Sequence, residues 1–428
     1  MRQTRIGSLA HGFRHLRRAP DMAALRAASS PAELARLALI PAGRNLGIAV
    51  SYLPTHLQAE ATAALLACRV LDAFEDLSDR AIASCAVLDA ADYLNGNTDI
   101  KPPALPSVSA EARDSEAVDR LLAERIGDIR ALLVALSPAG RKRVGAVVSD
   151  VAAVMARNID SPLSRVAYSE GVLGRVTYYA CELASEAVVP EADLRELAGC
   201  LAIIAQSAND LRDNELEIYG VADREELKRK VMLQLLVPAL GGFALLARLG
   251  PATPSFGARA AMAHMTITTT AFLCGAVDAP PPFRRKVGAA LLAASSSKYW
   301  TKMLDRVRRS VDVAVHRMLD VAPEFADGTN KATEALVVGD PLSMPTSLVP
   351  LIVDTTFAMV QTLPEGALTG ELADTEVRTM LIADHLAFSA MERVPPHDPE
   401  ALQALATQLQ LGALDTSVGG HDQVGQRT

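Results

Sequence analysis

Two short stretches of this sequence carry acidic side chains at the spacing of one helix face. In the first, Asp72 and Asp76 are four residues apart, which on an α-helix places their side chains about 5–6 Å from each other. Two like charges at this separation destabilise an isolated helix, and a hard divalent cation with oxygen ligands compensates for them. The pair therefore predicts a binding site for a cation such as Mg²⁺.

The second stretch offers three oxygen ligands on one predicted helix. Asn209, Asp213 and Glu217 follow one another at intervals of four residues, so a continuous helix would align them in one stripe. Gln206 lies one turn earlier on nearly the same stripe. Because carboxylate and amide oxygens are suitable ligands for hard cations, this spacing also predicts a Mg²⁺ site.

Both stretches lie in apolar surroundings, so the helices that carry them are expected to be buried. The first is surrounded by Leu65, Leu66, Val70, Leu71 and Phe74, and the second is preceded by residues 201–205 (LAIIA). Carboxylates on a buried helix are costly unless something compensates for their charge. Alone, the first stretch is also compatible with a solvated helix end. Two such helices in one chain can hold the several Mg²⁺ ions that neutralise a diphosphate.

The rest of the chain has the composition and periodicity of an all-α protein. Of its 428 residues, 50% are hydrophobic, 21% are charged and only 4% are aromatic, so the chain can bury a large core. Apolar residues recur at helical spacing over long segments, whereas short alternating strands are scarce. We predict helices over residues 41–80, 110–158 in two pieces, 164–187, 191–216, 231–249, 258–274, 284–319, 348–363, 371–391 and 399–411.

Charge and cysteine usage exclude several classes of protein. The net charge of −8 argues against general affinity for nucleic acid. The five cysteines form no CxxC pair and no HExxH motif is present, so a zinc site is not expected and the scattered thiols fit the cytoplasm. The apolar segment 231–247 contains Gln234 and Pro238, which favours a buried helix over a membrane span and leaves at most peripheral membrane contact. The sequence does not indicate an oligomeric state.

The two acidic stretches and three other segments resemble motifs of the squalene and phytoene synthase family. The segments match in order at residues 44–54 (RNLGIAVSYLP), 69–76 (RVLDAFED), 168–174 (YSEGVLG), 206–217 (QSANDLRDNELE) and 296–307 (SSKYWTKMLDRV). The resemblance covers about residues 36–320 and implies the class I isoprenoid synthase bundle, in which the two acidic motifs face each other across a central cavity. The remaining chain divides into a basic arm at 1–35, a helical extension at 321–415 and a disordered tail at 416–428.

The resemblance also implies roles for individual residues. Mg²⁺ would be held by Asp72 and Asp76 on one side and by Asn209, Asp213 and Glu217 on the other. The candidate contacts to the diphosphate are Arg44, Arg69, Arg212, Lys298 and Tyr299, and the candidate pocket residues are Tyr168, Gly171 and Gln206. Each basic residue is also compatible with a surface or structural ion pair.

Two departures from the family pattern bear on the expected reaction. Members that make squalene or phytoene carry a tyrosine where this chain has Arg165, and their second motif ends in a pair of acids where Leu216 precedes Glu217. We therefore expect the enzyme to ionise an allylic prenyl diphosphate and to pass the prenyl group to a small aromatic acceptor of the carbazole type. Arg165 would then hold a polar group of the acceptor, and Glu170 and Asp210 are candidate bases for the proton that the ring loses.

Three other functions remain open on the sequence. They are head-to-head condensation of two prenyl diphosphates, cyclisation of a single prenyl diphosphate, and a non-catalytic helical module that binds lipid or protein partners. The last of these has little need for two acidic stripes on buried helices.

Overall fold

The computed structural model describes residues 19–100, 102–105, 114–184, 191–234, 236–275 and 283–319. Within these ranges the chain contains helices and no β-strand, which confirms the all-α prediction. Residues 1–18, the predicted extension at 321–415 and the predicted tail at 416–428 lie outside the described residues.

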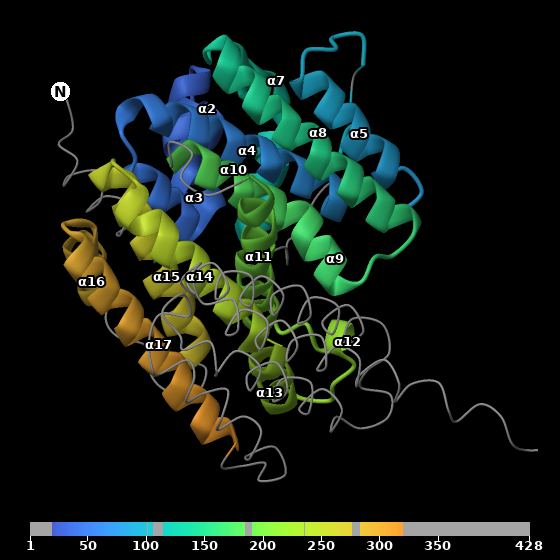
Figure 1. The fold of residues 1–428 in the computed structure, drawn as a ribbon. Coiled ribbons are helices and arrows are strands. Elements are labelled where there is room, and N and C mark those ends of the chain that lie inside the picture. The colour runs from blue at the N-terminus through green and yellow to red at the C-terminus, as the bar shows by residue number, and fades with distance from the viewer. Residues whose placement is uncertain are drawn as a thin grey trace, which may run out of the picture.

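Seventeen helical elements follow one another in the described part of the chain (Figure 1). They are α2 (Met22–Ala27), α3 (Pro31–Tyr52), α4 (Thr55–Leu77), α5 (Ala83–Leu94), α6 (Asp114–Glu124), α7 (Ile126–Val134), α8 (Pro138–Asp160), α9 (Arg165–Ser169), the π-helix η1 (Glu170–Gly174), α10 (Arg175–Ala184), α11 (Glu191–Asp213), α12 (Leu216–Tyr219), α13 (Arg224–Gln234), α14 (Leu236–Ala252), α15 (Phe256–Gly275), α16 (Phe283–Ala294) and α17 (Ser297–Leu319).

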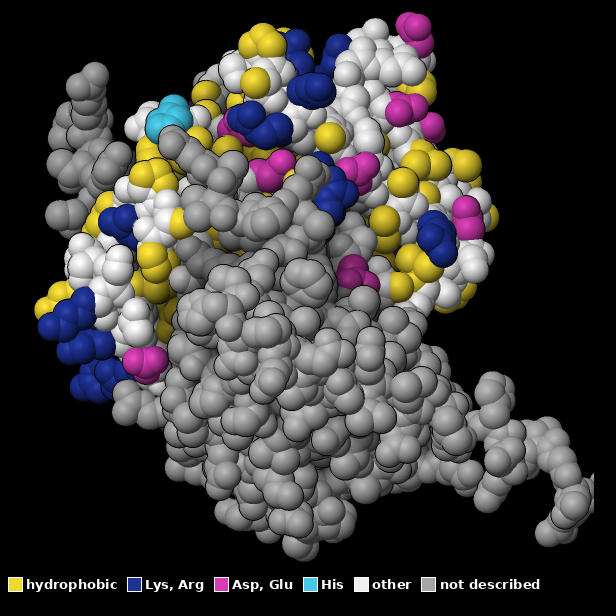
Figure 2. All heavy atoms as spheres, viewed as in Figure 1, with side chains coloured by type: hydrophobic (Ala, Val, Ile, Leu, Met, Phe, Trp, Pro, Cys, Tyr) yellow, Lys and Arg dark blue, Asp and Glu magenta, His cyan; other side chains and the backbone are white. Residues whose placement is uncertain are grey.

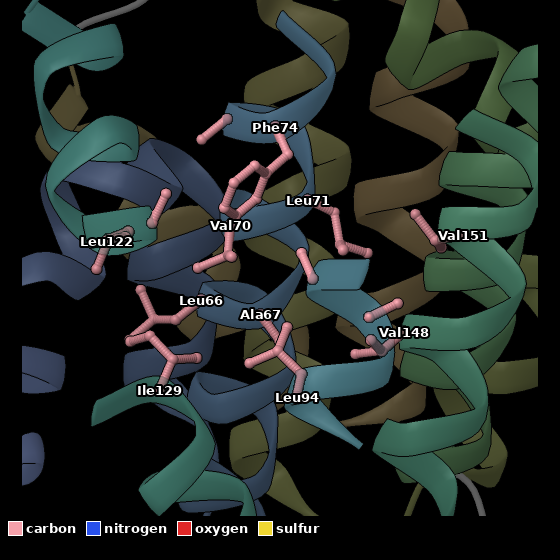
Figure 3. Packing of buried hydrophobic residues seen from close by; sticks show 14 of the residues in the cluster. Leu66, Ala67, Val70, Leu71, Phe74, Leu94, Leu122, Ile129, Val148 and Val151 are labelled. Carbon is pink, nitrogen blue, oxygen red and sulfur yellow. The ribbon is translucent and has the colours of Figure 1, made fainter. Parts of the chain in front are cut away.

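The largest core cluster is built around α4. Leu66, Val70, Leu71 and Phe74 are each at most 2% exposed, so this helix is apolar around much of its circumference. Figure 3 shows these side chains packed against residues of four other helices, namely Leu94 of α5, Leu122 of α6, Ile129 of α7, and Val148 and Val151 of α8. A helix that is apolar on most sides is stable only when it is surrounded by other helices. The first acidic motif therefore lies on a helix whose position is fixed by packing.

The helix that carries the second motif, α11, runs through the middle of the bundle (Figure 1). It packs on η1 and α10 and, on another side, on α14. In Figure 1 the helices α14 to α17 lie to one side of α11, and α5, α7 and α8 lie to the other. Both acidic motifs are thus carried by interior helices, as their apolar flanks predict.

The bundle begins before residue 36, where the sequence placed the end of a basic arm. Residues 22–27 form α2, and α3 starts at Pro31, directly after the N-cap Ser30, whose side chain accepts from the backbone N–H of Glu33 at 3.3 Å. Leu25 and Leu34 are buried in the main core cluster. Apolar burial therefore fixes residues 19–35 to the bundle.

The apolar segment 231–247 is divided between two helices. α13 ends at Gln234 and α14 begins at Leu236, and Phe243, Leu245 and Leu246 of α14 are buried. Among the described residues, no helix combines the length and the hydropathy that a membrane crossing requires.

We expect Trp300→Ala to lower the free energy of unfolding by about 3–5 kcal/mol, the usual cost of truncating a buried aromatic side chain. Trp300 is 1% exposed, its indole N–H donates to the carbonyl of Leu246 at 2.9 Å, and a Cβ on Gly250 would overlap its ring. Urea denaturation checks this value, with Tyr299→Ala as the matched control because that neighbouring aromatic is 40% exposed. Equal losses in the two variants would contradict the structure at this contact.

Candidate functional site

The first acidic motif is joined to a neighbouring helix through one arginine. Arg69 donates from Nη1 to Oδ2 of Asp72 at 2.5 Å and from Nε to Oδ1 of Asp119 at 3.0 Å, and its Nη2 also bonds to the Asp119 carboxylate. Asp119 lies on α6, which packs on α4. Asp119 was not among the site residues predicted from the sequence, because its segment carries none of the motifs described above.

The carboxylates of Asp72, Asp76 and Asp119 lie around Arg69, where burial limits their contact with water and their charges repel one another. Burial, reinforced by the charge of Asp72, raises the pKa of Asp76 to about 6. Burial likewise raises the pKa of Asp119 to about 6 although Arg69 opposes the shift, and it raises the pKa of Asp72. Burial lowers the pKa of Arg69, but Asp72 and Asp119 outweigh that effect, so the net shift is upward. More negative charge is gathered here than one guanidinium neutralises.

The second motif has a similar arrangement on α11. Arg212 donates to both carboxylate oxygens of Asp213, at 2.9 and 2.5 Å, and to Oδ1 of Asn209 at 3.1 Å. Asn209 and Asp213 are therefore on the same side of the helix, as their spacing predicts. Gln206 points elsewhere, because its amide donates to Oδ1 of Asp210 at 2.8 Å.

Arg44 lies within electrostatic reach of charged residues in both motifs. Burial among the helices lowers the pKa of Arg44, and the charge of Arg212 lowers it further, while Asp213 and Asp119 oppose the shift. Residues of α3, α4, α6 and α11 thus lie within electrostatic reach of one another. The family resemblance implied that the two motifs face each other and that Arg44 contacts the diphosphate, and this contact stays a prediction.

The backbone breaks the helix at Arg44. Its φ of 47° and ψ of −120° are non-helical, and the break follows Pro41, which has no N–H to donate within α3. A Cβ on Gly47 would overlap the carbonyl oxygen of Leu39, so only glycine lets the two halves of α3 approach this closely. A non-glycine residue at such a φ is strained, which marks Arg44 as a position where the surrounding structure dictates the backbone.

The predicted stripe from Asn209 through Glu217 is not continuous. The prediction that Glu217 shares one helix with Asn209 and Asp213 is wrong. α11 ends at Asp213, because Asn214 adopts a left-handed conformation (φ 61°) and the Glu215 N–H donates to the Asp210 carbonyl at 3.0 Å. This is the Schellman pattern that terminates helices. Glu217 lies on the separate helix α12 and is exposed. The ligand stripe on α11 therefore consists of Asn209 and Asp213.

The partly buried Arg165 and the buried Asp210 form an ion pair that ties α9 to α11. Arg165 donates from Nε to Oδ2 of Asp210 at 3.0 Å and from Nη2 to Oδ1. Tyr219 of α12 donates its hydroxyl to the same carboxylate at 3.0 Å. Together with Gln206, these contacts supply donors to both oxygens of Asp210, whose side chain is only 2% exposed. A carboxylate held in this way has the contacts of a structural anchor.

The segment after Arg165 connects α11 to the first motif. Tyr168 donates its hydroxyl to Oε2 of Glu75 at 2.8 Å, and the Arg165 guanidinium lies 5.5 Å from the centre of the Tyr168 ring. Burial raises the pKa of Glu75 to about 7, although the hydrogen bond from Tyr168 acts against that shift. In η1, a Cβ on Gly171 would overlap the methyl groups of Val154, so the glycine lets η1 pack closely on α8. Glu170 opens η1 and is half-buried.

A large apolar cavity of about 360 Å³ lies beside the acidic cluster. Its walls come from α3, α4, α8, η1, α10, α11, α14 and α15. Ala61, Ala64, Leu65 and Cys68 line it from α4, and Leu201, Ile204 and Ala205 line it from α11. The sequence analysis placed Tyr168, Gly171 and Gln206 in a pocket, but these three residues are not among those that line this cavity. In the segment of Tyr168 and Gly171, Leu173 lines the wall instead.

On both helices the acidic residues continue the stripe that lines the cavity. Asp72 lies one turn beyond Cys68, and Asp76 one turn further. Asn209 likewise lies one turn beyond Ala205, and Asp213 ends the helix. Since residues four apart share a helix face, each wall changes from apolar to acidic toward the C-terminal end of its helix. Figure 2 shows Asp and Glu side chains next to Lys and Arg side chains on the face seen in Figure 1.

Lys298 and Tyr299 occupy another part of the bundle. Both are exposed at the beginning of α17, which packs on α14, α15 and α16, whereas the acidic cluster is carried by α4, α6 and α11. Lys302 lies 6.0 Å from the centre of the Tyr299 ring. A contact of either residue with a diphosphate stays a prediction.

The donor atoms at this end of the cavity fit Mg²⁺ with substrate oxygens as additional ligands. In the ranges that the structure describes, no three Asp, Glu, His or Cys side chains form a metal-binding group by themselves. Mg²⁺ is commonly held by one or two carboxylates, waters and phosphate oxygens, so a complete protein cage is not required. Asp72 and Asp76 on α4, and Asn209 and Asp213 on α11, supply such oxygen donors.

Comparison with known proteins finds a match in fold. No family model matches the sequence, and no curated protein matches it. The solved structure of TcSQS with the ligand E5700 matches with a TM-score of 0.54 at 13% identity, over 75% of this chain and 97% of that chain. The structure of TcSQS with the ligand BPH1237 matches with a TM-score of 0.53 at 12% identity, over the same shares. The fold of this chain resembles that of a squalene synthase.

Proposed function

We propose that this protein is a Mg²⁺-dependent prenyltransferase that acts on an allylic prenyl diphosphate and releases diphosphate. The observation that carries the proposal is the pair of stripes on α4 and α11, each apolar along the cavity and acidic at one end. A prenyl diphosphate has the same division, with an apolar chain and an anionic head. The likeness to the squalene synthase fold supports this chemistry.

The apolar part of the cavity would hold the prenyl chain. Leu46, Leu65, Leu173, Ile204, Phe243 and Leu246 are among its lining residues. Burying a chain of about 15 carbons at roughly 0.8 kcal/mol per CH₂ is worth on the order of 10 kcal/mol before the costs of ordering. The cavity volume of about 360 Å³ falls within the usual range for small-molecule sites.

The acidic end would hold the diphosphate through Mg²⁺, with Asp72, Asp76 and Asn209 as ligands, and with Asp213 as a ligand once its two-oxygen pair with Arg212 opens. The bound metal would neutralise the negative charge of the diphosphate. The carbon–oxygen bond then breaks heterolytically, and both electrons leave with the diphosphate. Arg44 would donate hydrogen bonds to phosphate oxygens as that charge develops. The apolar walls keep water from the allylic cation.

We further propose that a small aromatic molecule accepts the prenyl group. A ring carbon would form the new bond, and the ring would lose its proton to a base. Asp210 is engaged with Arg165, and Glu170, which opens η1, is the candidate base that we retain from the sequence analysis. Thr266, Thr269 and Thr270 line the cavity from α15 and offer hydroxyl groups to a polar acceptor.

The five free cysteines support the expected cytoplasmic location.

Head-to-head condensation of two prenyl diphosphates is the second candidate, favoured by the likeness to TcSQS. Mass spectrometry of the reaction products distinguishes the two candidate functions. The protein is incubated with C5 to C20 prenyl diphosphates and Mg²⁺, with and without a carbazole-type acceptor. We expect carbon–carbon bond formation only with the acceptor. Squalene, phytoene or a cyclopropyl diphosphate formed from a prenyl diphosphate alone would reject the aromatic acceptor and establish the second candidate.

The proposed site also predicts a thermal response. We expect Mg²⁺ together with inorganic diphosphate to raise the melting temperature more than the sum of the two separate shifts, because each completes the binding site of the other. At a concentration 100 times the dissociation constant, the ligand pair would add about 2.7 kcal/mol of stability. Differential scanning fluorimetry, with EDTA as the reversal, measures the shift. The absence of any shift at millimolar concentrations would favour a non-catalytic helical module.

A further inference from the structure

We propose that Asp119 is a positioning residue for the diphosphate site. It fixes the Arg69 guanidinium so that Arg69 meets Asp72 through one nitrogen and leaves the second oxygen of Asp72 for Mg²⁺. This inference rests on the proposed function, and it adds α6 to the elements that build the site.

The hydrogen bonds of Arg69 give the geometric basis. Asp119 accepts hydrogen bonds from Nε and Nη2 of Arg69, the two nitrogens on one edge of the guanidinium. Only Nη1 donates to Asp72. A planar guanidinium that meets a carboxylate through two nitrogens is fixed in orientation as well as in position. The printed contact to Asp72 uses Oδ2 alone. Asp119 therefore determines which edge of Arg69 faces the first motif.

Burial shows which partner is fixed and which is accessible. The Asp119 side chain is 8% exposed, whereas those of Arg69 and Asp72 are 28% and 25% exposed. Val118 and Leu122, on either side of Asp119 along α6, are fully buried in the main core cluster. The position of Asp119 is thus set by core packing, and Arg69 and Asp72 lie on the side that a ligand can reach.

Charge explains why the second carboxylate is needed. With Asp119 removed, the whole guanidinium edge becomes available to Asp72, and a bidentate pair within α4 would compete with Mg²⁺ for both oxygens of that residue. With Asp119 present, the charge of Arg69 is shared between two carboxylates. Partners that orient a metal ligand in this way commonly change metal affinity by about 10–100-fold when they are replaced.

The chain contains a matched control in Glu60, near the other end of α4. The Glu60 side chain is also 8% exposed, and it accepts from Arg143 through two nitrogens at 2.9 and 2.8 Å. Glu60→Gln therefore disturbs a similar two-nitrogen arginine pair without touching the acidic cluster. It reports how much of any effect comes from weakening a buried ion pair on α4.

The test measures the Mg²⁺ concentration that gives half of the maximal thermal stabilisation at saturating inorganic diphosphate. We expect Asp119→Ala to raise this Mg²⁺ concentration by about tenfold or more, and Asp119→Asn to raise it less. Glu60→Gln should lower the melting temperature but leave the half-saturating Mg²⁺ concentration unchanged. Asp119→Asn keeps the side-chain shape and serves if the alanine variant does not fold.

The outcomes separate this inference from the proposed function. A wild-type protein that does not respond to Mg²⁺ and diphosphate would reject the proposed function itself. A wild-type protein that responds, with Asp119 variants of unchanged half-saturating concentration, would overturn only the positioning role. An equal increase in Glu60→Gln would also overturn it, because the effect would then belong to α4 as a whole.

Discussion

Replacing Asp72 with alanine is expected to lower the rate of diphosphate release from a prenyl diphosphate by at least about 10²–10³-fold, the usual cost of losing one strong electrostatic contact to a developing charge. The change removes a proposed metal ligand and leaves Arg69 paired with Asp119. Packing of α4 should persist, because its buried residues other than Glu60 are apolar. The far-ultraviolet circular dichroism should therefore match that of the wild type.

Asp128→Ala is the matched control for this experiment. Asp128 accepts from Arg125 at 2.6 Å with the same three-residue spacing that separates Arg69 and Asp72, but on α7, which carries none of the proposed ligands. It should keep the wild-type rate. If Asp72→Ala retained more than about a tenth of the wild-type rate, the proposed position of the metal site would have to be abandoned.

Asp210→Ala should lower the free energy of unfolding by about 3–5 kcal/mol, because it removes a buried carboxylate and leaves the partly buried Arg165 without its partner. The variant also deprives Gln206 and Tyr219 of their acceptor. Asp150→Ala, which removes the 57% exposed partner of Arg175, should cost less than about 1 kcal/mol. Chemical denaturation with a common m-value measures both changes.

The combined variant Arg165→Met/Asp210→Leu tests the same contact by replacing both charged partners with apolar side chains. Apolar side chains of similar volume often replace a buried ion pair at little cost, so the double variant should recover most of the lost stability. A small loss of stability in Asp210→Ala, together with abolished turnover, would instead return Asp210 to the role of a catalytic base. The two roles thus give opposite patterns of stability and activity.

The sequence was sufficient to predict the interior helices and the shared side of Asn209 and Asp213 on α11. The apolar residues around Asp72 and before Asn209 have helical periodicity, and burial of such helices follows from hydrophobic packing alone. The spacing of four residues placed Asn209 and Asp213 on one side of α11, where both contact Arg212. These features depend on local sequence, which a single chain displays directly.

Features that depend on contacts between distant segments were not predictable in this way. Asp119 reaches Arg69 across 50 positions of sequence, and nothing near it distinguishes it from a surface acid. The end of α11 at Asn214 depends on a left-handed residue in a run that otherwise favours a helix. Lys298 and Tyr299 were placed by resemblance alone, and α17 packs on a different group of helices.

The direction of α4 and α11 has a consequence for the order in which ligands bind. Asp76 lies one residue before the end of α4, and Asp213 is the last residue of α11, so both acidic motifs lie at helix C-termini. There the aligned peptide dipoles add roughly half a negative charge per helix. A free diphosphate anion would meet repulsion from both, and Arg69 and Arg212 are already paired with carboxylates. The cation should therefore enter before the anion, which initial-rate kinetics would register as an ordered addition.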